Sequence, residues 1–224
     1  VLNRLEKAYV SELRGDATSV VVTTPLLGTG YASTPDATSE RRVLVAGGTQ
    51  WRKGGSDNAE VIRELLTRHS DVLVTWLGVD QDVVNTSMPE TLRQRVRPVL
   101  SFRSDEVGEL LAAHRVVVHL SRFEGWGMFV VEALSHGCLV VGTDVGVVGE
   151  VIASSGYVVP IGDRRAASAA IDSALQDSDF AERSHRAAEA ASRFEPSRVV
   201  ALLVENYREA IRVKMERYRS EGNS

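Results

Sequence analysis

Residues 115–150 read RVVVHLSRFEGWGMFVVEALSHGCLVVGTDVGVVGE, and this stretch is the clearest guide to the fold. It begins with an apolar, β-branched run at 116–120, which predicts a buried strand. After a polar turn, apolar residues recur at helical spacing as far as Gly137, and a second buried strand is predicted at 139–142. A strand, a helix and a strand within so short a span form one βαβ unit, so the two strands should be parallel.

The same alternation of strand and helix continues on both sides of this unit. Further strands are predicted at 43–46, 72–77, 96–100 and 157–160, and helices at 57–67, 89–95, 104–114, 164–176, 178–192 and from 196 to about 218. Pro98 lacks an N–H group, which favours an edge position for the strand at 96–100. The pattern predicts an α/β fold with a doubly wound, Rossmann-like parallel sheet and helices on both faces.

The turn between the strand at 116–120 and the following helix is the best candidate for a functional site. A helix that starts near Gly127 leaves its first N–H groups unpaired and carries partial positive charge at that end. Gly125 and Gly127 would let a phosphate approach the backbone. Glu124 and Glu132 flank the turn, and eight helical residues would separate them by about 12 Å and about 80°. We therefore expect them to hold two parts of one long ligand rather than to form an acid/base pair.

Composition excludes several classes of protein. A net charge of -4 over 224 residues gives no indication of a nucleic-acid partner. The only cysteine, Cys138, excludes an intrachain disulfide and fits a cytoplasmic protein. No apolar run is long enough to span a membrane, and the first residues do not show the basic-then-apolar layout that a signal peptide would have. A membrane surface as partner is not indicated and is left open. His119 and His136 are interpreted as structural, and no spacing of ligands predicts a metal site.

The stretch SRFEGWGMFVVEALSHGCLVVGTDVGVVGEVI, residues 121–152, resembles the donor-binding signature of retaining GT-B glycosyltransferases, the glycosyl transferases group 1 family. The match includes the two glutamates, the Gly-Trp-Gly turn and the following Thr-Asp-x-Gly. The resemblance implies that Glu124 contacts the hydroxyls of the donor sugar, that Glu132 holds the ribose, and that the loop amides between them hold the diphosphate. The donor-binding residues expected on this basis are Arg52, Gly125, Trp126, Gly127, Met128, Phe129 and Glu132.

A second part of the resemblance covers GGTQWRKGG, residues 47–55. The family carries an arginine and a lysine here, and both neutralise the donor diphosphate. Lys53 matches the lysine and is assigned with Glu124 to catalysis, and Arg52 stands beside it. Gly48 stands where the arginine is expected, which leaves open whether donor affinity or full activity is retained.

The resemblance also suggests a division of the chain. Residues 1–40 are assigned to the tail of an N-terminal domain, with a helix at 2–14, a strand at 19–23 and a linker at 28–40. Residues 41–195 are assigned to the nucleotide-sugar-binding domain, and 196–224 to a crossing helix with a frayed end. The first residue is Val1, and we expect most of the first domain to be missing from this sequence.

The function implied is transfer of a sugar from a nucleotide-sugar donor to an acceptor, with retention of configuration and without a metal or other cofactor. Because the acceptor site would belong to the missing domain, we expect the chain alone to be inactive. The residues leave the base, the sugar, the acceptor and the oligomeric state open. Two other interpretations remain: a catalytically silent nucleotide-binding or regulatory module, and a sugar-nucleotide epimerase, which shares the GT-B fold.

Overall fold

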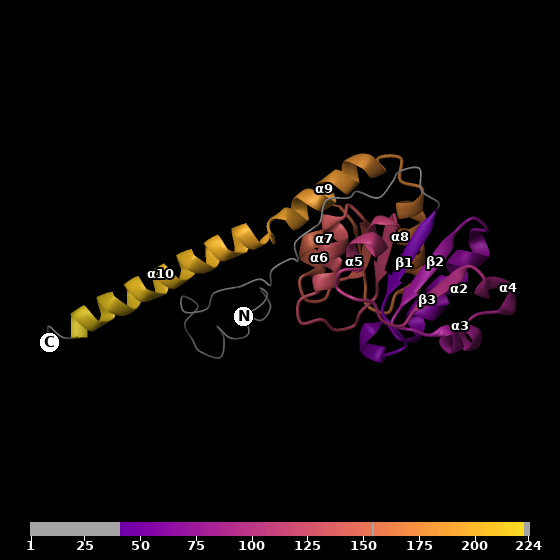
Figure 1. Cartoon of the computed structure of the whole chain (residues 1–224), viewed down its shortest axis with the longest axis horizontal. Helices are drawn as coiled ribbons and strands as arrows, with labels where there is room; N and C mark the ends of the chain where they lie inside the picture. The colour runs from indigo at the N-terminus through magenta and orange to yellow at the C-terminus, as the bar shows by residue number, and fades with distance from the viewer. Residues whose placement is uncertain (1–40, 154, 222–224) are drawn as a thin grey trace. The chain divides into compact units, whose positions relative to one another are not determined.

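A computed structural model describes residues 41–153 and 155–221 of the chain (Figure 1). The helix, strand and linker predicted within residues 1–40 lie outside the described residues, so their assignment to a preceding domain stays a prediction. The chain divides into two compact units, one of residues 30–192 and one that combines 1–29 with 193–224. Each unit is described by itself.

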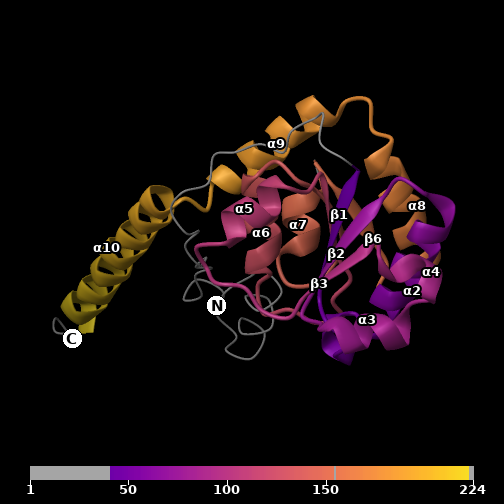
Figure 2. The same ribbon diagram turned by 45° about the vertical axis from the view of Figure 1, so that its right-hand side comes forward.

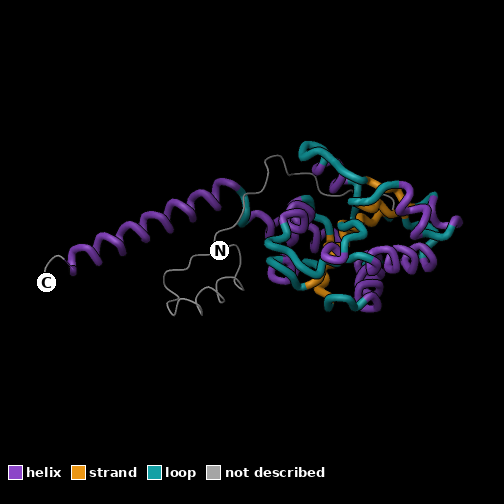
Figure 3. Tube along the Cα trace, turned by 90° about the horizontal axis from the view of Figure 1, so that it is seen from below, coloured by secondary structure: helices purple, strands orange, loops and turns teal. Residues whose placement is uncertain are grey.

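The unit of residues 30–192 is built on a six-stranded sheet in the order β3-β2-β1-β4-β5-β6, and every neighbouring pair is parallel. This confirms the doubly wound parallel sheet, and β3 lies at an edge as Pro98 predicted. In Figure 3 the strands, in orange, lie between helices, in purple. The strands are β1 (Arg42–Ala46), β2 (Leu73–Leu77), β3 (Val96–Val99), β4 (Val116–His119), β5 (Leu139–Thr143) and β6 (Tyr157–Val159).

Helices cover both faces of the sheet, with α2 and α8 on one side and α5, α6 and α7 on the other (Figure 2). The sequence missed α3 and α7, which have seven and five residues and are too short for a clear helical period. The elements are the 3-10 helix η2 (Trp51–Lys53), α2 (Ser56–Arg68), α3 (Gln81–Ser87), α4 (Glu90–Arg93), α5 (Val107–Ala112), α6 (Met128–Ser135), α7 (Val148–Ile152), α8 (Arg164–Leu175) and α9 (Phe180–Ser192).

The packing of the core explains why the sequences of the central strands are continuous apolar runs. All four residues of β4 are buried, because β4 has helices on both faces. On the face of α2 and α8, alternate strand residues such as Val45 and Val118 pack together with the fully buried Trp76. The Trp76 indole Nε1 donates to the carbonyl oxygen of Gly47 at 2.7 Å. The core therefore also fixes the start of the loop that follows β1.

The described part of the other unit is a single long helix, α10 (Pro196–Glu221). It begins with proline in its first turn, as predicted, and extends three residues beyond the predicted end. Large apolar side chains are exposed every three or four residues along it: Val200, Val204, Tyr207, Ile211 and Met215. No helix in the described ranges is long and apolar enough to cross a membrane.

Candidate functional site

The candidate site lies where the order of the strands reverses. The chain builds β1, β2 and β3 outward and then returns to place β4 on the other side of β1. In parallel sheets, ligands bind at the carboxyl ends of the strands at such a reversal. Here the loop after β1 and the loop after β4 meet beside a cleft of about 330 Å³. Its lining includes Gly47, Gly48, Gln50, Lys53, His119 and Phe129.

The loop after β1 is held rigidly by one buried amide. Asn58, in the first turn of α2, is completely buried. Its Nδ2 group donates to the carbonyl oxygens of Lys53 at 2.9 Å, Gly47 at 3.1 Å and Gly48 at 3.2 Å. Gly47 adopts a φ of 136°, and a Cβ atom there would lie 2.3 Å from the Lys53 carbonyl oxygen. This tight loop presents Lys53 to the cleft.

The structure gives a physical reason for glycine at position 48. A Cβ atom on Gly48 would lie only 2.4 Å from the carbonyl oxygen of Gly78, in the loop after β2. An arginine side chain therefore has no room on this backbone unless one of the two loops moves. Simple replacement of Gly48 by arginine would disturb the loop as well as add a charge, so it is a poor test of whether donor binding has been lost.

Glu124, in the loop after β4, is the centre of a network of hydrogen bonds. Its Oε1 atom lies 2.5 Å from the Lys53 Nζ atom, 2.7 Å from the Ser121 Oγ atom and 3.2 Å from the His119 Nε2 atom. The side chain of Glu124 is only 9% exposed. Among the described residues none donates a hydrogen bond to its other oxygen, Oε2. One oxygen is therefore saturated by protein donors and the other is available to a ligand.

The same contacts set the charge of Glu124. Burial raises the pKa of the carboxyl group, but hydrogen bonds from His119, Lys53 and Ser121 outweigh burial and lower the pKa to about 2. Glu124 is thus a carboxylate throughout the neutral range. It can accept hydrogen bonds from hydroxyl groups, and it has no proton to give as a general acid.

Glu132 has a different environment. It is the fifth residue of α6, one turn in, as the sequence predicted. Burial raises the pKa of its half-buried carboxyl group. Within the described ranges, no side chain or backbone group forms a hydrogen bond or an ion pair with this carboxyl group. A desolvated carboxylate without a described partner, on the helix whose residue Phe129 lines the cleft, is a candidate ligand contact.

The turn between the two glutamates leaves space for a bulky group. Gly127 adopts a φ of 108° and precedes α6, whose first turn has no side-chain cap. A Cβ atom at the exposed Gly125 would meet nothing within 4 Å, so no protein contact explains a glycine there. The uncapped amides of an eight-residue helix and open space before them suit a phosphate group.

The remaining predicted site residues lie on η2, in the turn before α6 and at the start of α6. Phe129 lines the cleft and its ring centroid lies 6.2 Å from that of Phe102. The Trp126 side chain is buried within the loop, so its contact with a ligand stays a prediction. Met128 begins α6 and is half-buried. Arg52 is exposed on η2, and its guanidinium group has no partner among the residues that the structure describes.

A partly buried ion pair helps to connect the two loops, and no pattern in the sequence indicates it. The guanidinium group of Arg122 pairs with Asp57 in the first turn of α2. The backbone N–H group of Arg122 also donates to the Arg52 carbonyl oxygen at 2.9 Å. These partners are far apart in the chain, so only the fold brings them together. They fix the distance between the loop that carries Lys53 and the loop that carries Glu124.

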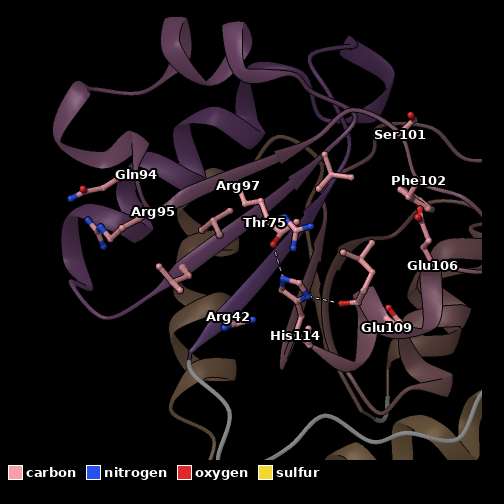
Figure 4. A pocket seen from close by; sticks show the side chains of 15 residues that line it. Arg42, Thr75, Gln94, Arg95, Arg97, Ser101, Phe102, Glu106, Glu109 and His114 are labelled. Atoms are coloured by element: carbon pink, nitrogen blue, oxygen red, sulfur yellow. Dashed lines mark hydrogen bonds between the residues drawn. The ribbon is translucent and has the colours of Figure 1, made fainter.

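A larger groove of about 680 Å³ lies on the face of β1, β2 and β3 beside α5 (Figure 4). In it His114 bonds through Nε2 to the Thr75 hydroxyl at 2.8 Å and through Nδ1 to the Leu110 carbonyl oxygen at 2.6 Å. Burial lowers the pKa of His114 to about 4. The groove contains none of the predicted site residues and runs along a face of the sheet. We therefore place the site in the smaller cleft.

No group of three or more histidine, cysteine, aspartate or glutamate side chains in the described ranges could hold a metal ion. Lys53, which lines the cleft, brings a positive charge to it and pairs with Glu124.

Comparison with known proteins identifies a family. The family described as glycosyl transferases group 1 matches residues 32–194. O-antigen chain mannosyltransferase B of Escherichia coli is 32% identical over 120 residues, which are 53% of this chain and 32% of that protein.

Solved structures share the fold at low identity. A variant of TarM from S. aureus, solved with UDP, has a TM-score of 0.73 at 16% identity, over 92% of this chain and 42% of that one. Sucrose-phosphate synthase from Thermosynechococcus elongatus has a TM-score of 0.70 at 20% identity, over 93% and 57% of the two chains. HepE from Anabaena, solved with UDP and glucose, has a TM-score of 0.70 at 20% identity, over 90% and 60%.

The chain thus spans about a third of its curated relative and about half of these solved structures. Its parallel sheet is the Rossmann-like half of a GT-B fold, as the sequence predicted. The chain belongs to the glycosyl transferases group 1 family.

Proposed function

We propose that this chain is the donor-binding part of a retaining glycosyltransferase that takes a hexose from a nucleoside-diphosphate sugar. The observation that carries the proposal is the ion pair between Glu124 and Lys53, which lines the cleft at the carboxyl edge of the sheet. A cation for a diphosphate and a permanently charged acceptor for sugar hydroxyls lie side by side. The family membership and the signature at 121–152 support the same assignment.

In the proposed mechanism, the donor lies across the turn before α6. The amides at the start of α6 and the ammonium group of Lys53 face the diphosphate. When the bond to the sugar breaks, negative charge grows on the diphosphate leaving group, and these donors stabilise it. Glu124 accepts hydrogen bonds from the sugar hydroxyls through its Oε2 atom, and Glu132 accepts them from the ribose. The donor is itself the substrate, so the proposed reaction needs no further cofactor.

The donor sugar and its base are left to experiment. The curated relative is named a mannosyltransferase, and two of the structural relatives were solved with UDP. GDP-mannose and UDP-hexoses are therefore the first donors to test. Because the chain spans only part of its relatives, we further propose that an N-terminal domain supplies the acceptor site. The isolated chain should then bind donor without transferring sugar, and measurable transfer by it would disprove this second proposal.

The test is a thermal-shift screen of the chain against UDP, GDP, ADP and dTDP and their hexose conjugates. A ligand at about 100 times its dissociation constant adds about 2.7 kcal/mol to stability. For a domain of this size that is roughly 5 to 10 °C in melting temperature. We expect a shift with one base, and its loss in Glu132→Gln. Glu109→Gln changes an exposed glutamate on α5 whose side chain has no described partner; it is the control and should keep the shift. No shift with any nucleotide would contradict the proposal.

Gly48 favours one rival, a nucleotide-binding module that no longer transfers sugar. Such a module would bind the nucleoside diphosphate but have no use for a sugar contact. The rival therefore predicts that Glu124→Gln does not change the ratio between the affinity for the nucleoside diphosphate and the affinity for its sugar conjugate. Our proposal predicts that this variant weakens binding of the sugar conjugate more than binding of the diphosphate.

A further inference from the structure

His119 is the last residue of β4 and lies where the cleft begins. It is 3% exposed, and it lines the cleft together with Lys53 and Phe129. Its partner in the register of the sheet is Gly142 of β5. Because β4 is a central strand of the sheet, the backbone that carries this imidazole is held on both sides.

The contacts of His119 determine which of its two ring nitrogens carries a hydrogen. Its Nε2 atom lies 3.2 Å from the Glu124 Oε1 atom and 3.4 Å from the Ser121 Oγ atom. An ionised carboxylate can only accept, so Nε2 carries a hydrogen and donates it to Glu124. In the neutral ring, Nδ1 is then an acceptor. Nδ1 is shielded from water and has no hydrogen-bond partner within the described ranges.

A buried acceptor without a donor is unusual and calls for an explanation. The cleft beside His119 is where the proposed donor sugar would lie, and each sugar hydroxyl carries a hydrogen that it can donate. A bound sugar would therefore complete the hydrogen bonding of this ring. His119 would then bond in two directions, through Nε2 to Glu124 and through Nδ1 to the ligand, once binding displaces the protein atoms that cover Nδ1 in the free chain.

The ion pair between Lys53 and Glu124 adds a second reason for this arrangement. It is the shortest of the contacts to Oε1, yet the proposed diphosphate would attract the same ammonium group. If Lys53 turns to the diphosphate, Glu124 loses that contact at the moment when the sugar arrives. Only His119 and Ser121 would then hold its carboxylate in position.

We propose that His119 is a positioning residue that makes this site selective for the sugar-bearing nucleotide over the bare diphosphate. It fixes Glu124 through Nε2 and accepts a hydrogen bond from a donor-sugar hydroxyl through Nδ1. The inference rests on the proposed function and extends it to a residue that the sequence suggested was only structural.

Two amide variants separate the two nitrogens. His119→Gln places an amide donor near the position of Nε2 and removes Nδ1, whereas His119→Asn places an amide near Nδ1 and removes the donor to Glu124. Titration calorimetry would measure the dissociation constants of the nucleotide sugar and of the matching diphosphate for each. We expect either variant to raise the dissociation constant of the nucleotide sugar roughly tenfold, as for one lost hydrogen bond. The dissociation constant of the diphosphate should change less than about twofold.

The matched control is His114→Gln, which alters another buried histidine with two hydrogen bonds, in the groove outside the cleft. It should leave both constants unchanged. A double-mutant cycle of His119→Asn with Glu124→Gln should be non-additive, because His119→Asn acts through Glu124.

Equal weakening of both ligands by the His119 variants, or additive effects in the cycle, would show a merely structural role and overturn the inference alone. No binding of either ligand by the unaltered chain would overturn the proposed function and this inference with it.

Discussion

Glu124→Gln tests the electrostatics of the site through the stability of the fold. The side chain keeps its shape, so the amide oxygen can still accept from Lys53, Ser121 and His119. What the variant removes is the charge. In the folded chain burial raises the pKa of Glu124, yet these three donors lower it from the ordinary 4.5 to about 2. Because the folded pKa is the lower one, the stabilisation is present above pH 4.5 and is lost as the pH falls toward 2.

The magnitude follows from the two pKa values. One pKa unit corresponds to about 1.4 kcal/mol, so the full contribution is about 3 kcal/mol. Little discount for solvent is needed because the Glu124 side chain is only 9% exposed. Between pH 6 and pH 3 the unfolded carboxyl group takes up a proton and the folded one stays largely ionised. Over this interval the unaltered chain should lose about 2 kcal/mol more stability than Glu124→Gln does.

Urea unfolding followed by tryptophan fluorescence, at pH 6 and at pH 3, would measure this difference. All other carboxyl groups titrate in both proteins and cancel in the comparison. Glu109→Gln, at a residue whose exposed side chain has no described partner, is the matched control and should lose as much stability as the unaltered chain. If Glu124→Gln and the unaltered chain lost equal stability, Glu124 would not be held as a charged group, and the reasoning about the site would be refuted.

Three further predictions concern the support of the site. Asn58→Ala removes the donor to three loop carbonyls and should lower the free energy of unfolding by about 1 to 3 kcal/mol in urea unfolding; an unchanged value would contradict its role as a clamp. Arg122→Met leaves Asp57 mostly buried without its main partner. We expect the free energy of unfolding to fall by about 2 kcal/mol, which lies between the values for exposed and for buried ion pairs. A fall below about 0.5 kcal/mol would contradict a link between the loops. Burial raises the pKa of the Cys138 thiol to about 12, so a thiol reagent at pH 8 should label it only in denaturant, and rapid labelling of the folded chain would contradict the core packing.

The sequence was sufficient for features that depend on local order and composition. The apolar β-branched runs predicted the six described strands to within one or two residues, and Pro98 predicted the edge. Spacing alone placed Glu124 before α6 and Glu132 one turn into it. These signals are local because strand burial and helix period are properties of neighbouring residues.

The sequence could not reveal contacts that the fold creates between distant segments. The amide of Asn58 shows no pattern that would mark it as a clamp for a loop. His119 was interpreted as structural, because its contact with the Glu124 carboxylate exists only in the folded chain. Gly48 departs from the family motif, and the sequence offers no reason for it. The structure does, because the backbone of Gly78 lies too close to allow a side chain at position 48. In each case the partner is known only once the loops meet.

The most direct test of the central claim is to map nucleotide binding on the isotope-labelled chain by NMR, using the diphosphate found in the screen. We predict that the amide signals of 47–53 and 125–129 shift at saturation, while those lining the groove beside α5, such as Thr75 and His114, stay in place. Shifts confined to that groove, with the loops after β1 and β4 unaffected, would contradict the assignment of the donor site.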